Sequence, residues 1–170
     1  MLDRVRAPVL DVGCGPGRHA LALTLRGVAA LGVDTAASAA AIAARRGVPV
    51  LVRSVFEPIP GVGTWGTALL MDGSIGIGGD PEALLRRIRQ LVRWDGRALA
   101  EVGPPGTPTE SLWVRGEVGG SPIGGWFPWA VVGADGLSEI AKASGFRVGE
   151  LWTRTDRWFA RLDARPGGVA

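Results

Sequence analysis

The stretch VLDVGCGPGRH (residues 9–19) joins an apolar run to a loop with three alternating glycines and then to basic residues. The run predicts a short buried strand, and the residues after Gly17 have the apolar spacing of a helix. A loop that leaves a strand and enters a helix offers free N–H groups and the positive end of the helix dipole. Glycines there let a ligand lie against the backbone, where any Cβ would collide. The stretch therefore predicts a ligand site near the start of the chain.

The residues around this loop favour one class of ligand over another. Dinucleotide sites use G-x-G-x-x-G, and Arg18 stands where the third glycine would be. Asp11 lies two residues before Gly13 and would repel a pyrophosphate but attract a ligand ammonium; bracing the loop through its N–H groups is the alternative. Asp34 ends a second apolar run, and a carboxylate there can accept hydrogen bonds from both hydroxyls of a ribose. Together these features predict a zwitterionic nucleoside rather than a diphosphate.

Apolar runs alternate with helical patterns along most of the chain. The strand-like runs are residues 7–12, 28–33, 48–53, 65–71, 97–102, 147–153 and 157–162, and the helical patterns are residues 17–26, 36–46, 81–93 and 135–143. Such alternation predicts a mainly parallel α/β sheet with helices on both faces. Residues 103–132 break the pattern with many glycines and prolines, although 112–118 and 126–132 have the pattern of a hairpin. We expect a single domain, 1–170, with 103–132 as an irregular insertion over the cleft.

With these features the sequence resembles the class I S-adenosylmethionine-dependent methyltransferases. VLDVGCGPGRH is similar to their glycine-rich first motif, and GVD at 32–34 is similar to the acidic end of their second strand. A more specific likeness is DGSIGIGGD (residues 72–80), which resembles DGNIGIGGD in a group of small bacterial methyltransferases, with Ser74 in place of asparagine. The resemblance implies a Rossmann-like methyltransferase fold. Its sheet has seven strands in the order 3-2-1-4-5-7-6, of which only the last is antiparallel.

The resemblance also implies the residues of a site for S-adenosyl-L-methionine. Asp34 would hold the ribose, Asp11 would lie near the amine, and Met71 and its neighbours would face the sulfonium and its methyl group. Ser54 stands where the family carries an acid for the adenine amino group, and its hydroxyl can accept that hydrogen bond. The expected cofactor-binding set is Asp11, Gly13, Cys14, Gly15, Gly17, Asp34, Ser54, Val55, Phe56, Met71, Asp72 and Gly73.

The expected activity is methyl transfer to a small-molecule acceptor by in-line displacement, for which positioning can supply much of the rate. No catalytic residue is assigned, because His19 and Asp72 each have simpler roles in packing or orientation. Trp126, Phe127 and Trp129, within 103–132, offer rigid apolar surface for the acceptor. No Asp/Asn-Pro-Pro-aromatic sequence follows the fourth strand, which disfavours the nucleic-acid and glutamine enzymes that carry it.

Two other functions stay open at this stage. The family has a helix ahead of the first strand, where this sequence has residues 1–7, so a non-catalytic S-adenosylmethionine-binding module that needs a partner is one alternative. The other is a nicotinamide-dependent oxidoreductase, which Arg18 and Asp11 disfavour. The same short start predicts an open cleft rim at which a homodimer would form.

Composition narrows the setting in which the protein works. The net charge is +3. The densest group of arginines in the sequence, at positions 86, 89, 93 and 97, has the spacing of the solvent-exposed face of a helix. No nucleic-acid surface is therefore predicted. One cysteine and one histidine without clustered ligands predict no metal site. The longest uncharged run is rich in glycine and proline, and the first residues are too charged for a signal peptide. We therefore expect a cytoplasmic enzyme without a membrane partner.

Overall fold

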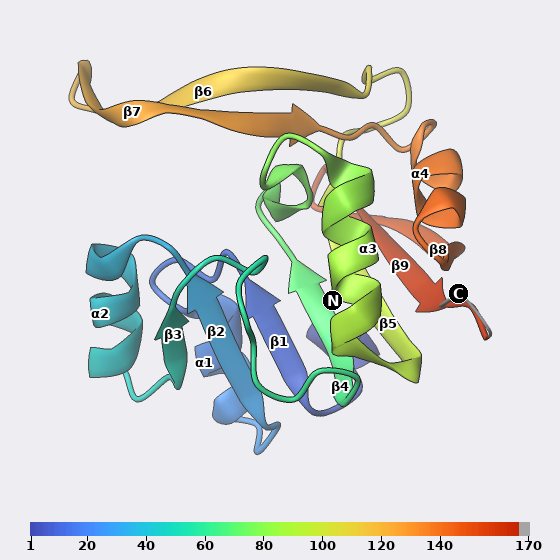
Figure 1. Cartoon of the computed structure of the whole chain (residues 1–170), viewed down its shortest axis with the longest axis horizontal. Helices are drawn as coiled ribbons and strands as arrows, with labels where there is room; N and C mark the ends of the chain where they lie inside the picture. The colour runs from blue at the N-terminus through green and yellow to red at the C-terminus, as the bar shows by residue number, and fades with distance from the viewer. Residues whose placement is uncertain (167–170) are drawn as a thin grey trace.

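A computed structural model describes residues 1–166, which form an α/β structure around a seven-stranded sheet (Figure 1). The strands are β1 Val9–Val12, β2 Ala30–Asp34, β3 Val50–Val52, β4 Trp65–Leu70, β5 Val92–Val102, β6 Glu110–Val118, β7 Ser121–Val131, β8 Phe146–Arg154 and β9 Arg157–Ala164. The α-helices are α1 Arg18–Thr24, α2 Ala37–Arg45, α3 Pro81–Leu91 and α4 Leu137–Ala143, and two short 3₁₀ helices are η1 Leu2–Arg4 and η2 Ser74–Gly76.

The order of the strands in the large sheet is β3-β2-β1-β4-β5-β9-β8. The first five are parallel, with Val12 beside Val33 and Leu10 beside Ala68 in the central registers. β9 runs antiparallel to both β5 and β8. In the numbering of the sheet's own strands this is 3-2-1-4-5-7-6 with only the last strand antiparallel, so the predicted topology is confirmed. The carboxyl ends of β1 to β5 therefore lie along one edge of the sheet.

Helices cover both faces of the sheet, as predicted. Successive residues of each central strand point to opposite faces of the sheet, and those on both faces are apolar, so each face is covered. On one face, Leu10 and Leu70 belong to a large buried cluster with apolar residues of α3 and α4. On the other face, Val9 and Leu69 pack with Leu23 of α1. Figure 1 shows α3 and α4 in front of the sheet and α1 behind it. All four residues of β1 and all six of β4 are buried, which fixes the two strands whose ends carry the expected ligand loops.

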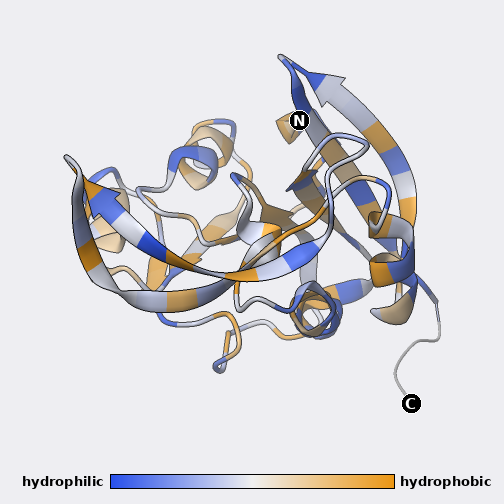
Figure 2. Cartoon of the chain, turned by 90° about the horizontal axis from the view of Figure 1, so that it is seen from above, coloured by the Kyte–Doolittle hydropathy of each residue, from blue (hydrophilic) through white to orange (hydrophobic). Residues whose placement is uncertain are grey.

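Residues 103–132, expected as an irregular insertion, contain a regular antiparallel hairpin of β6 and β7. The pairing of the two predicted strand segments is correct, but both strands begin earlier and enclose a short turn at Gly119 and Gly120. Seen from above, the hairpin curves across the carboxyl edge of the sheet, with apolar and polar residues interspersed along it (Figure 2). Its alternation of side chains, rather than its glycine content, determined the local structure.

The glycines of DGSIGIGGD are explained by the strand that crosses them. Ile77 forms an isolated bridge with Trp129 of β7. A Cβ on Gly76 would collide with the carbonyl oxygen of Ala130, and one on Gly79 would lie 2.9 Å from Cβ of Pro128. The segment thus lets β7 approach backbone to backbone, and this approach fixes the hairpin above the end of β4.

The fifth strand begins earlier than the predicted residue 97. α3 ends at Leu91, and β5 begins at once with Val92, which pairs with Trp65 of β4. The register between the two strands then shifts, and Gly96 lies inside β5, where a Cβ would be 3.1 Å from the carbonyl oxygen of Trp65. Cβ of Val92 and the carbonyl oxygen of Arg93 would lie closer still, at 2.8 and 3.0 Å, so the glycine allows β5 to bulge where its register with β4 shifts. None of the helices in residues 1–166 is long and apolar enough to cross a membrane.

Candidate functional site

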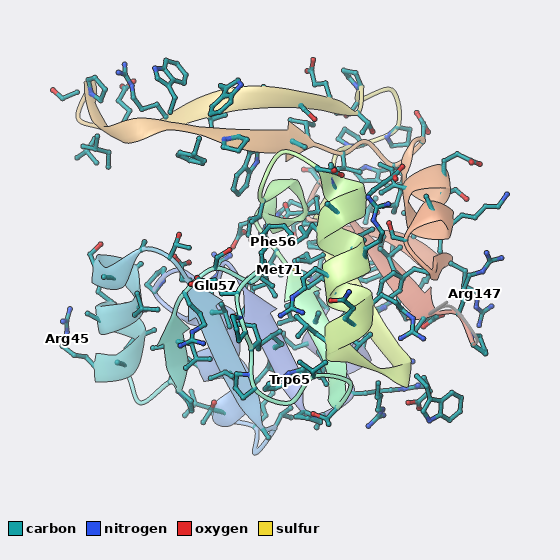
Figure 3. All side chains as sticks on the ribbon, viewed as in Figure 1. Arg45, Phe56, Glu57, Trp65, Met71 and Arg147 are labelled. Atoms are coloured by element: carbon teal, nitrogen blue, oxygen red, sulfur yellow. The ribbon has the colours of Figure 1, made fainter. Side chains whose placement is uncertain are left out.

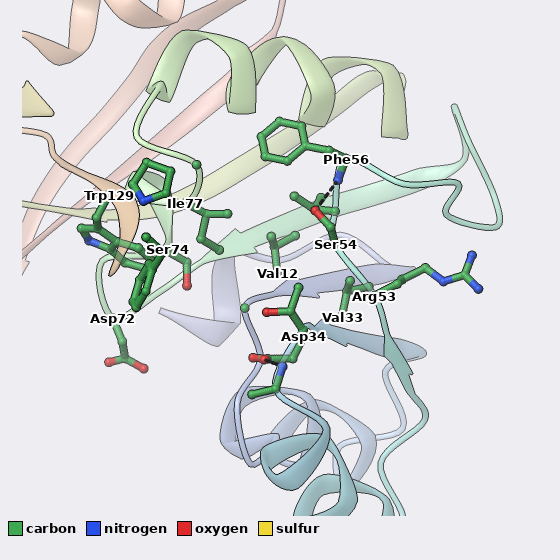
Figure 4. Close-up of a pocket in the computed structure, with 17 residues that line it drawn as sticks. Val12, Val33, Asp34, Arg53, Ser54, Phe56, Asp72, Ser74, Ile77 and Trp129 are labelled. Atoms are coloured by element: carbon green, nitrogen blue, oxygen red, sulfur yellow. Dashed lines mark hydrogen bonds between the residues drawn. The ribbon is translucent and has the colours of Figure 1, made fainter. Parts of the chain in front are cut away.

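A cavity of about 770 Å³ lies at the carboxyl ends of the parallel strands and is roofed by β7 (Figure 4). Its lining comes from the loops after β1, β2, β3 and β4 and from the hairpin. The lining residues are Val12, Gly13, Val33, Asp34, Thr35, Ala36, Arg53, Ser54, Val55, Phe56, Asp72, Ser74, Ile77, Gly78, Phe127, Pro128 and Trp129. This is the edge at which open parallel sheets bind their ligands.

Six of the twelve residues expected to bind cofactor line the cavity, and six do not. The six in the lining are Gly13, Asp34, Ser54, Val55, Phe56 and Asp72. The residues outside the lining are Asp11, Cys14, Gly15, Gly17, Met71 and Gly73. Trp65 and Met71 lie at opposite ends of β4, with Met71 at the cavity end (Figure 3).

The three glycines of the first loop have different functions although all have a positive φ, of 66°, 51° and 77° in turn. A Cβ on Gly13 would lie 2.8 Å from Oγ of Ser74, so this glycine lets the loops after β1 and β4 meet. A Cβ on Gly15 would have no protein atom within 4 Å. A Cβ on Gly17 would lie 2.9 Å from Cβ of Ala43, so this glycine seats α1 against α2. Only Gly15 faces open space.

Asp34 connects the glycine loop to the start of α2. Its Oδ2 accepts a hydrogen bond from the Gly15 N–H at 2.7 Å, and its Oδ1 accepts one from the Ala36 N–H at 2.8 Å. Each carboxylate oxygen has a second acceptor site, so both can also receive a ligand hydroxyl. Asp34 is the last residue of β2, and the parallel pairing of β2 with β1 places the end of β2 beside the glycine loop that follows β1.

The loop after β3 forms another wall of the cavity. Oγ of Ser54 accepts a hydrogen bond from the Phe56 N–H at 3.2 Å, and the Ser54 N–H donates to Oε2 of Glu57 at 2.6 Å. The Phe56 side chain is 45% exposed and lies close to Gly78, where a Cβ would be 3.1 Å from the ring. This pair of hydrogen bonds holds an aromatic ring at the cavity, beside the buried Val55.

Asp11 and Cys14 are buried under the loop instead of lining the cavity. Oδ2 of Asp11 accepts a hydrogen bond from the Ala20 N–H at 3.1 Å, which braces the first turn of α1. Burial raises the pKa of Asp11 to about 6. Burial also raises the pKa of the Cys14 thiol to about 12, and a Cβ on Gly32 would lie only 2.6 Å from its Sγ. The thiol is therefore a packing group under β2 and is protonated at neutral pH.

The raised pKa of Asp11 predicts that Asp11→Asn changes the pH dependence of stability. Between about pH 4 and pH 6 the folded protein keeps the Asp11 proton while the unfolded chain has released it, so stability falls as the pH rises through this window. Asparagine does not titrate. We expect the free energy of unfolding of the wild type to fall by about 2 kcal/mol relative to the variant between pH 4 and pH 8. Urea unfolding of both proteins across this range measures the difference, and a constant difference would contradict the prediction.

Asp72 lies at the centre of a charged cluster at the cavity rim. Its φ of 54° is unusual for a residue other than glycine. Its carboxylate accepts hydrogen bonds from Arg18 and Arg157, each as short as 2.6 Å, and its N–H donates to Oε2 of Glu101 at 2.8 Å. Arg157 also pairs with Glu101 through Nε at 2.7 Å. Residues from α1, β5, β9 and the loop after β4 thereby fix one carboxylate.

The charges of this cluster set the protonation of its members. Burial acts to raise the pKa of Asp72, but the hydrogen bond from Arg157 and the charge of Arg18 outweigh it and lower that pKa. Burial and the charge of Arg18 lower the pKa of His19, although His19 lies 3.5 Å from the Asp72 carboxylate. Asp72 is therefore ionised at neutral pH, and His19 is neutral.

The aromatic residues of β7 divide between the two faces of the hairpin. Phe127 and Trp129 line the cavity and meet edge to face, with ring centroids 6.1 Å apart. Trp126 does not line the cavity; it is 61% exposed, and Arg115 lies over its ring at 5.0 Å. Its expected place in the wall is thus wrong, because successive residues of a strand point to opposite faces. Side chains project from both faces of the hairpin in Figure 3.

The sequence model of a known family matches residues 10–100, more than half of the chain, and the description of that family is "Methyltransferase domain". The match spans β1 to β5 and therefore every parallel strand whose end contributes to the cavity. The chain belongs to the methyltransferase-domain family. Its fold is that of the class I S-adenosylmethionine-dependent methyltransferases, as expected from the glycine motif and the strand order.

This methyltransferase domain is similar to an uncharacterized protein of Mycobacterium tuberculosis, with 33% identity over 148 residues. The alignment covers 87% of this chain and 50% of the mycobacterial protein, and the same figures apply to a protein of Mycobacterium bovis. The chain spans about half the length of the curated relatives it matches.

Solved structures share the fold of the methyltransferase domain. One is an S-adenosylmethionine-dependent methyltransferase of Bacteroides fragilis in complex with S-adenosyl-L-homocysteine, with a TM-score of 0.80 and 24% identity. The likeness covers 96% of this chain and 75% of that one. Another is the 1,6-didemethyltoxoflavin-N1-methyltransferase of Burkholderia thailandensis, with a TM-score of 0.67, 20% identity, and coverage of 92% and 70%.

The sequence reasoning missed several lining residues of the methyltransferase domain. Thr35 and Ala36 directly follow the GVD motif at 32–34, and Ser74, Ile77 and Gly78 belong to DGSIGIGGD, so both groups lay within or next to motifs identified in the sequence. Within residues 1–166, no group of three or more His, Cys, Asp or Glu side chains could hold a metal ion.

Proposed function

We propose that the protein is an S-adenosylmethionine-dependent methyltransferase whose large cavity binds the cofactor and whose acceptor is a small molecule. The observation that carries the proposal is the position of Asp34, whose carboxylate lies at the end of β2 in the lining of the cavity, beside Gly15. In a chain of this family, a carboxylate at that point with acceptor sites left over suits the two ribose hydroxyls. The Bacteroides fragilis structure supports the proposal because it holds S-adenosyl-L-homocysteine on the same fold.

The cavity fits the proposed cofactor in its polar and apolar parts. Asp34 would hold the ribose, and Ser54, Val55 and Phe56 would flank the adenine, since an aromatic ring and a hydroxyl lie at that wall. Asp72 lies at the opposite end of the lining and is ionised, which suits the positive end of the cofactor. Gly13 would lie against the ligand itself.

The six expected residues outside the lining have a supporting role in this proposal. Gly15 leaves space and donates its N–H to Asp34, while Gly17 seats α1. Asp11 and Cys14 hold the loop from beneath. Met71 and Gly73 shape the end of β4, of which Met71 is buried. Asp11 is buried and does not line the cavity, so it would not contact the methionine amine in this conformation.

When bound, S-adenosylmethionine would supply an electrophilic methyl carbon, to which a lone pair of the acceptor would bond in line as the carbon–sulfur bond breaks and its electron pair stays with sulfur. The protein's contribution is positioning and the exclusion of water, for which the roof of β7 and the fixed Asp72 are suited. A proton lost by an O–H or N–H acceptor passes to solvent at the exposed rim. No side chain of the protein needs to act as a strong base in this scheme.

Calorimetric titration with S-adenosylhomocysteine and with NAD tests the proposed cofactor. We expect binding of S-adenosylhomocysteine and none of NAD, because Arg18 follows the glycine loop where a pyrophosphate site needs its third glycine. Binding of NAD alone would favour an oxidoreductase. Binding of S-adenosylhomocysteine without methyl transfer to any small molecule would favour a non-catalytic module.

The two aromatic residues of β7 that line the cavity, Phe127 and Trp129, predict a variant that separates cofactor binding from methyl transfer. The double change Phe127→Ala with Trp129→Ala removes the two rings that face the cavity. We expect loss of transfer of labelled methyl groups to the small-molecule fraction of a cell extract, with affinity for S-adenosylhomocysteine within about fivefold, or 1 kcal/mol, of the wild type. Trp113→Ala with Trp126→Ala is the matched control, since both rings are largely exposed. Equal loss of transfer in the control would contradict the prediction.

A further inference from the structure

The hairpin of β6 and β7 has a free edge along β6. Within residues 1–166 the two strands form a sheet of their own, and β6 pairs with no strand other than β7. β7 lies on the side of the large sheet, where Trp129 bridges to Ile77 in the loop after β4. β6 lies farther from the large sheet than β7 does (Figure 1). The backbone N–H and C=O groups on the outer side of β6 are therefore open to a further strand.

The same hairpin carries much of the exposed apolar surface. Its strands have 9 and 11 residues, yet they hold five of the eleven large apolar side chains that are exposed in residues 1–166. These five are Trp113, Val118, Ile123, Trp126 and Phe127, of which only Phe127 lines the cavity. A two-stranded hairpin is marginally stable by itself and gains stability from further strands. Both the edge and the apolar surface thus suit a partner that adds a strand.

β6 itself is regular, because the irregularity of the hairpin lies in β7. Between the pairs Val114–Phe127 and Gly116–Ile123, β6 contributes one residue and β7 contributes three. The extra residues bulge out of β7, which leaves β6 as an extended strand over its 9 residues. Its free edge can therefore form a regular ladder of hydrogen bonds with another strand.

The turn of the hairpin determines which residues of β6 face the free edge. Residues 119–120 form this turn, and both glycines have a positive φ, of 57° and 79°. In a turn of this kind the flanking pair, here Val118 and Ser121, exchanges hydrogen bonds within the hairpin. Along a strand, the N–H and C=O groups of successive residues point to opposite sides. Those of Glu117 and Arg115 therefore point to the free edge.

The charges of β6 are complementary to those of a second copy of the same strand. Arg115 and Glu117 are both exposed, and neither forms a salt bridge within residues 1–166. In an antiparallel pair with a two-fold axis at Gly116, Arg115 of each chain lies opposite Glu117 of the partner subunit. These are the residues whose backbone groups face the free edge, so one register satisfies both the ladder and the charges. Gly116 meets its own copy at the axis without a side chain in between.

We propose that β6 pairs antiparallel with β6 of a second copy of this chain, about a two-fold axis at Gly116, so that two hairpins form one four-stranded sheet. A two-fold interface must be self-complementary, and the opposite charges of Arg115 and Glu117 meet this requirement twice. Such directly opposite pairs stabilise a sheet. The turn of the hairpin lies at the α2 end of the molecule (Figure 1), so an axis near this turn directs the two chains away from each other. The pairing depends on the hairpin alone and not on the proposed cofactor.

Sedimentation equilibrium of charge-reversal variants tests this pairing. Arg115→Glu places two carboxylates opposite each other, and Glu117→Arg places two guanidinium groups opposite each other. We expect a wild-type dimer whose dissociation constant rises at least about tenfold in each single variant. The double change Arg115→Glu with Glu117→Arg should restore the wild-type constant, because the exchanged charges are again opposite. Arg147→Glu, at an exposed position of the edge strand β8, is the matched control and should leave the constant unchanged.

An equimolar mixture of the two single variants gives an independent test. One chain then carries two carboxylates and the other carries two guanidinium groups, so we expect a mixed dimer with the wild-type affinity. Wild-type protein that stays monomeric up to about 0.1 mM would overturn the pairing. A dimer that the single changes leave intact, or that neither the double change nor the mixture restores, would overturn it as well. Equal weakening by Arg147→Glu would also overturn it, since net charge would then be the cause.

Discussion

Replacement of Asp34 with alanine is expected to weaken binding of S-adenosylhomocysteine at least about tenfold. The variant loses the carboxylate proposed for the ribose, where each charge-assisted hydrogen bond contributes about 1.5–3 kcal/mol before compensation. It also loses the hydrogen bonds from the N–H groups of Gly15 and Ala36, so the glycine loop is no longer fixed to the start of α2. The two losses act in the same direction, and calorimetric titration measures their sum.

Two further variants show which loss matters. Asp34→Asn keeps one acceptor oxygen and can keep one loop hydrogen bond, so its affinity should lie between those of the alanine variant and the wild type. Asp80→Ala removes a comparable contact away from the cavity lining, the hydrogen bond from the Ala83 N–H at 2.9 Å that caps α3. It should lower the melting temperature and leave affinity intact. Wild-type affinity in Asp34→Ala would rule out the ribose assignment.

Gly15→Val is expected to abolish binding of S-adenosylhomocysteine. The backbone of Gly15 has a φ of 51°, which a β-branched residue adopts only at a cost of about 1–2 kcal/mol. No protein atom would lie within 4 Å of the new Cβ, so the side chain enters open space that the ligand needs. A relaxed backbone would also draw the Gly15 N–H away from Asp34.

The matched control for this strain is Gly27→Val. Gly27 follows α1, has a φ of 73°, and likewise has no protein atom within 4 Å of a Cβ. It precedes β2, at the edge of the sheet opposite the cavity, whereas Gly15 is bonded to Asp34 in the cavity lining. Both variants should therefore lose similar stability in thermal melts, while only Gly15→Val loses the ligand. Normal binding by Gly15→Val would mean that the glycine is needed for the turn alone. Equal loss of binding in both variants would mean that strain, not blocked space, is the cause.

Much of the fold could be predicted because local patterns carry it. The apolar residues of 9–12 and 65–70 recur as buried strands, and their alternation with helical spacing allows only a covered parallel sheet. Asp34 could be located for the same reason, since a polar residue that ends a buried strand must lie at the carboxyl edge. The exact strand order came from the family resemblance rather than from the alternation.

The hairpin marks the limit of reasoning from composition. Its glycines and prolines suggested an irregular segment, yet β6 and β7 pair along most of their length. The predicted strand 126–132 implies that Phe127 and Trp129 face away from Trp126, but all three were expected on one surface. Similarly, the predicted fifth strand began only at residue 97, because an irregular register between two strands leaves no local signal.

The sequence by itself determined the parallel sheet, the glycine loop and the acid at the end of β2, because each depends on residues close together in the chain. Only the tertiary structure decided that Asp72 is held by Arg157, 85 residues away, and that Glu101 accepts from both of them. It also decided that Asp11 and Cys14 are buried instead of lining the cavity. Contacts of this kind depend on the register of distant strands and on the volume of packed side chains, which no local pattern encodes.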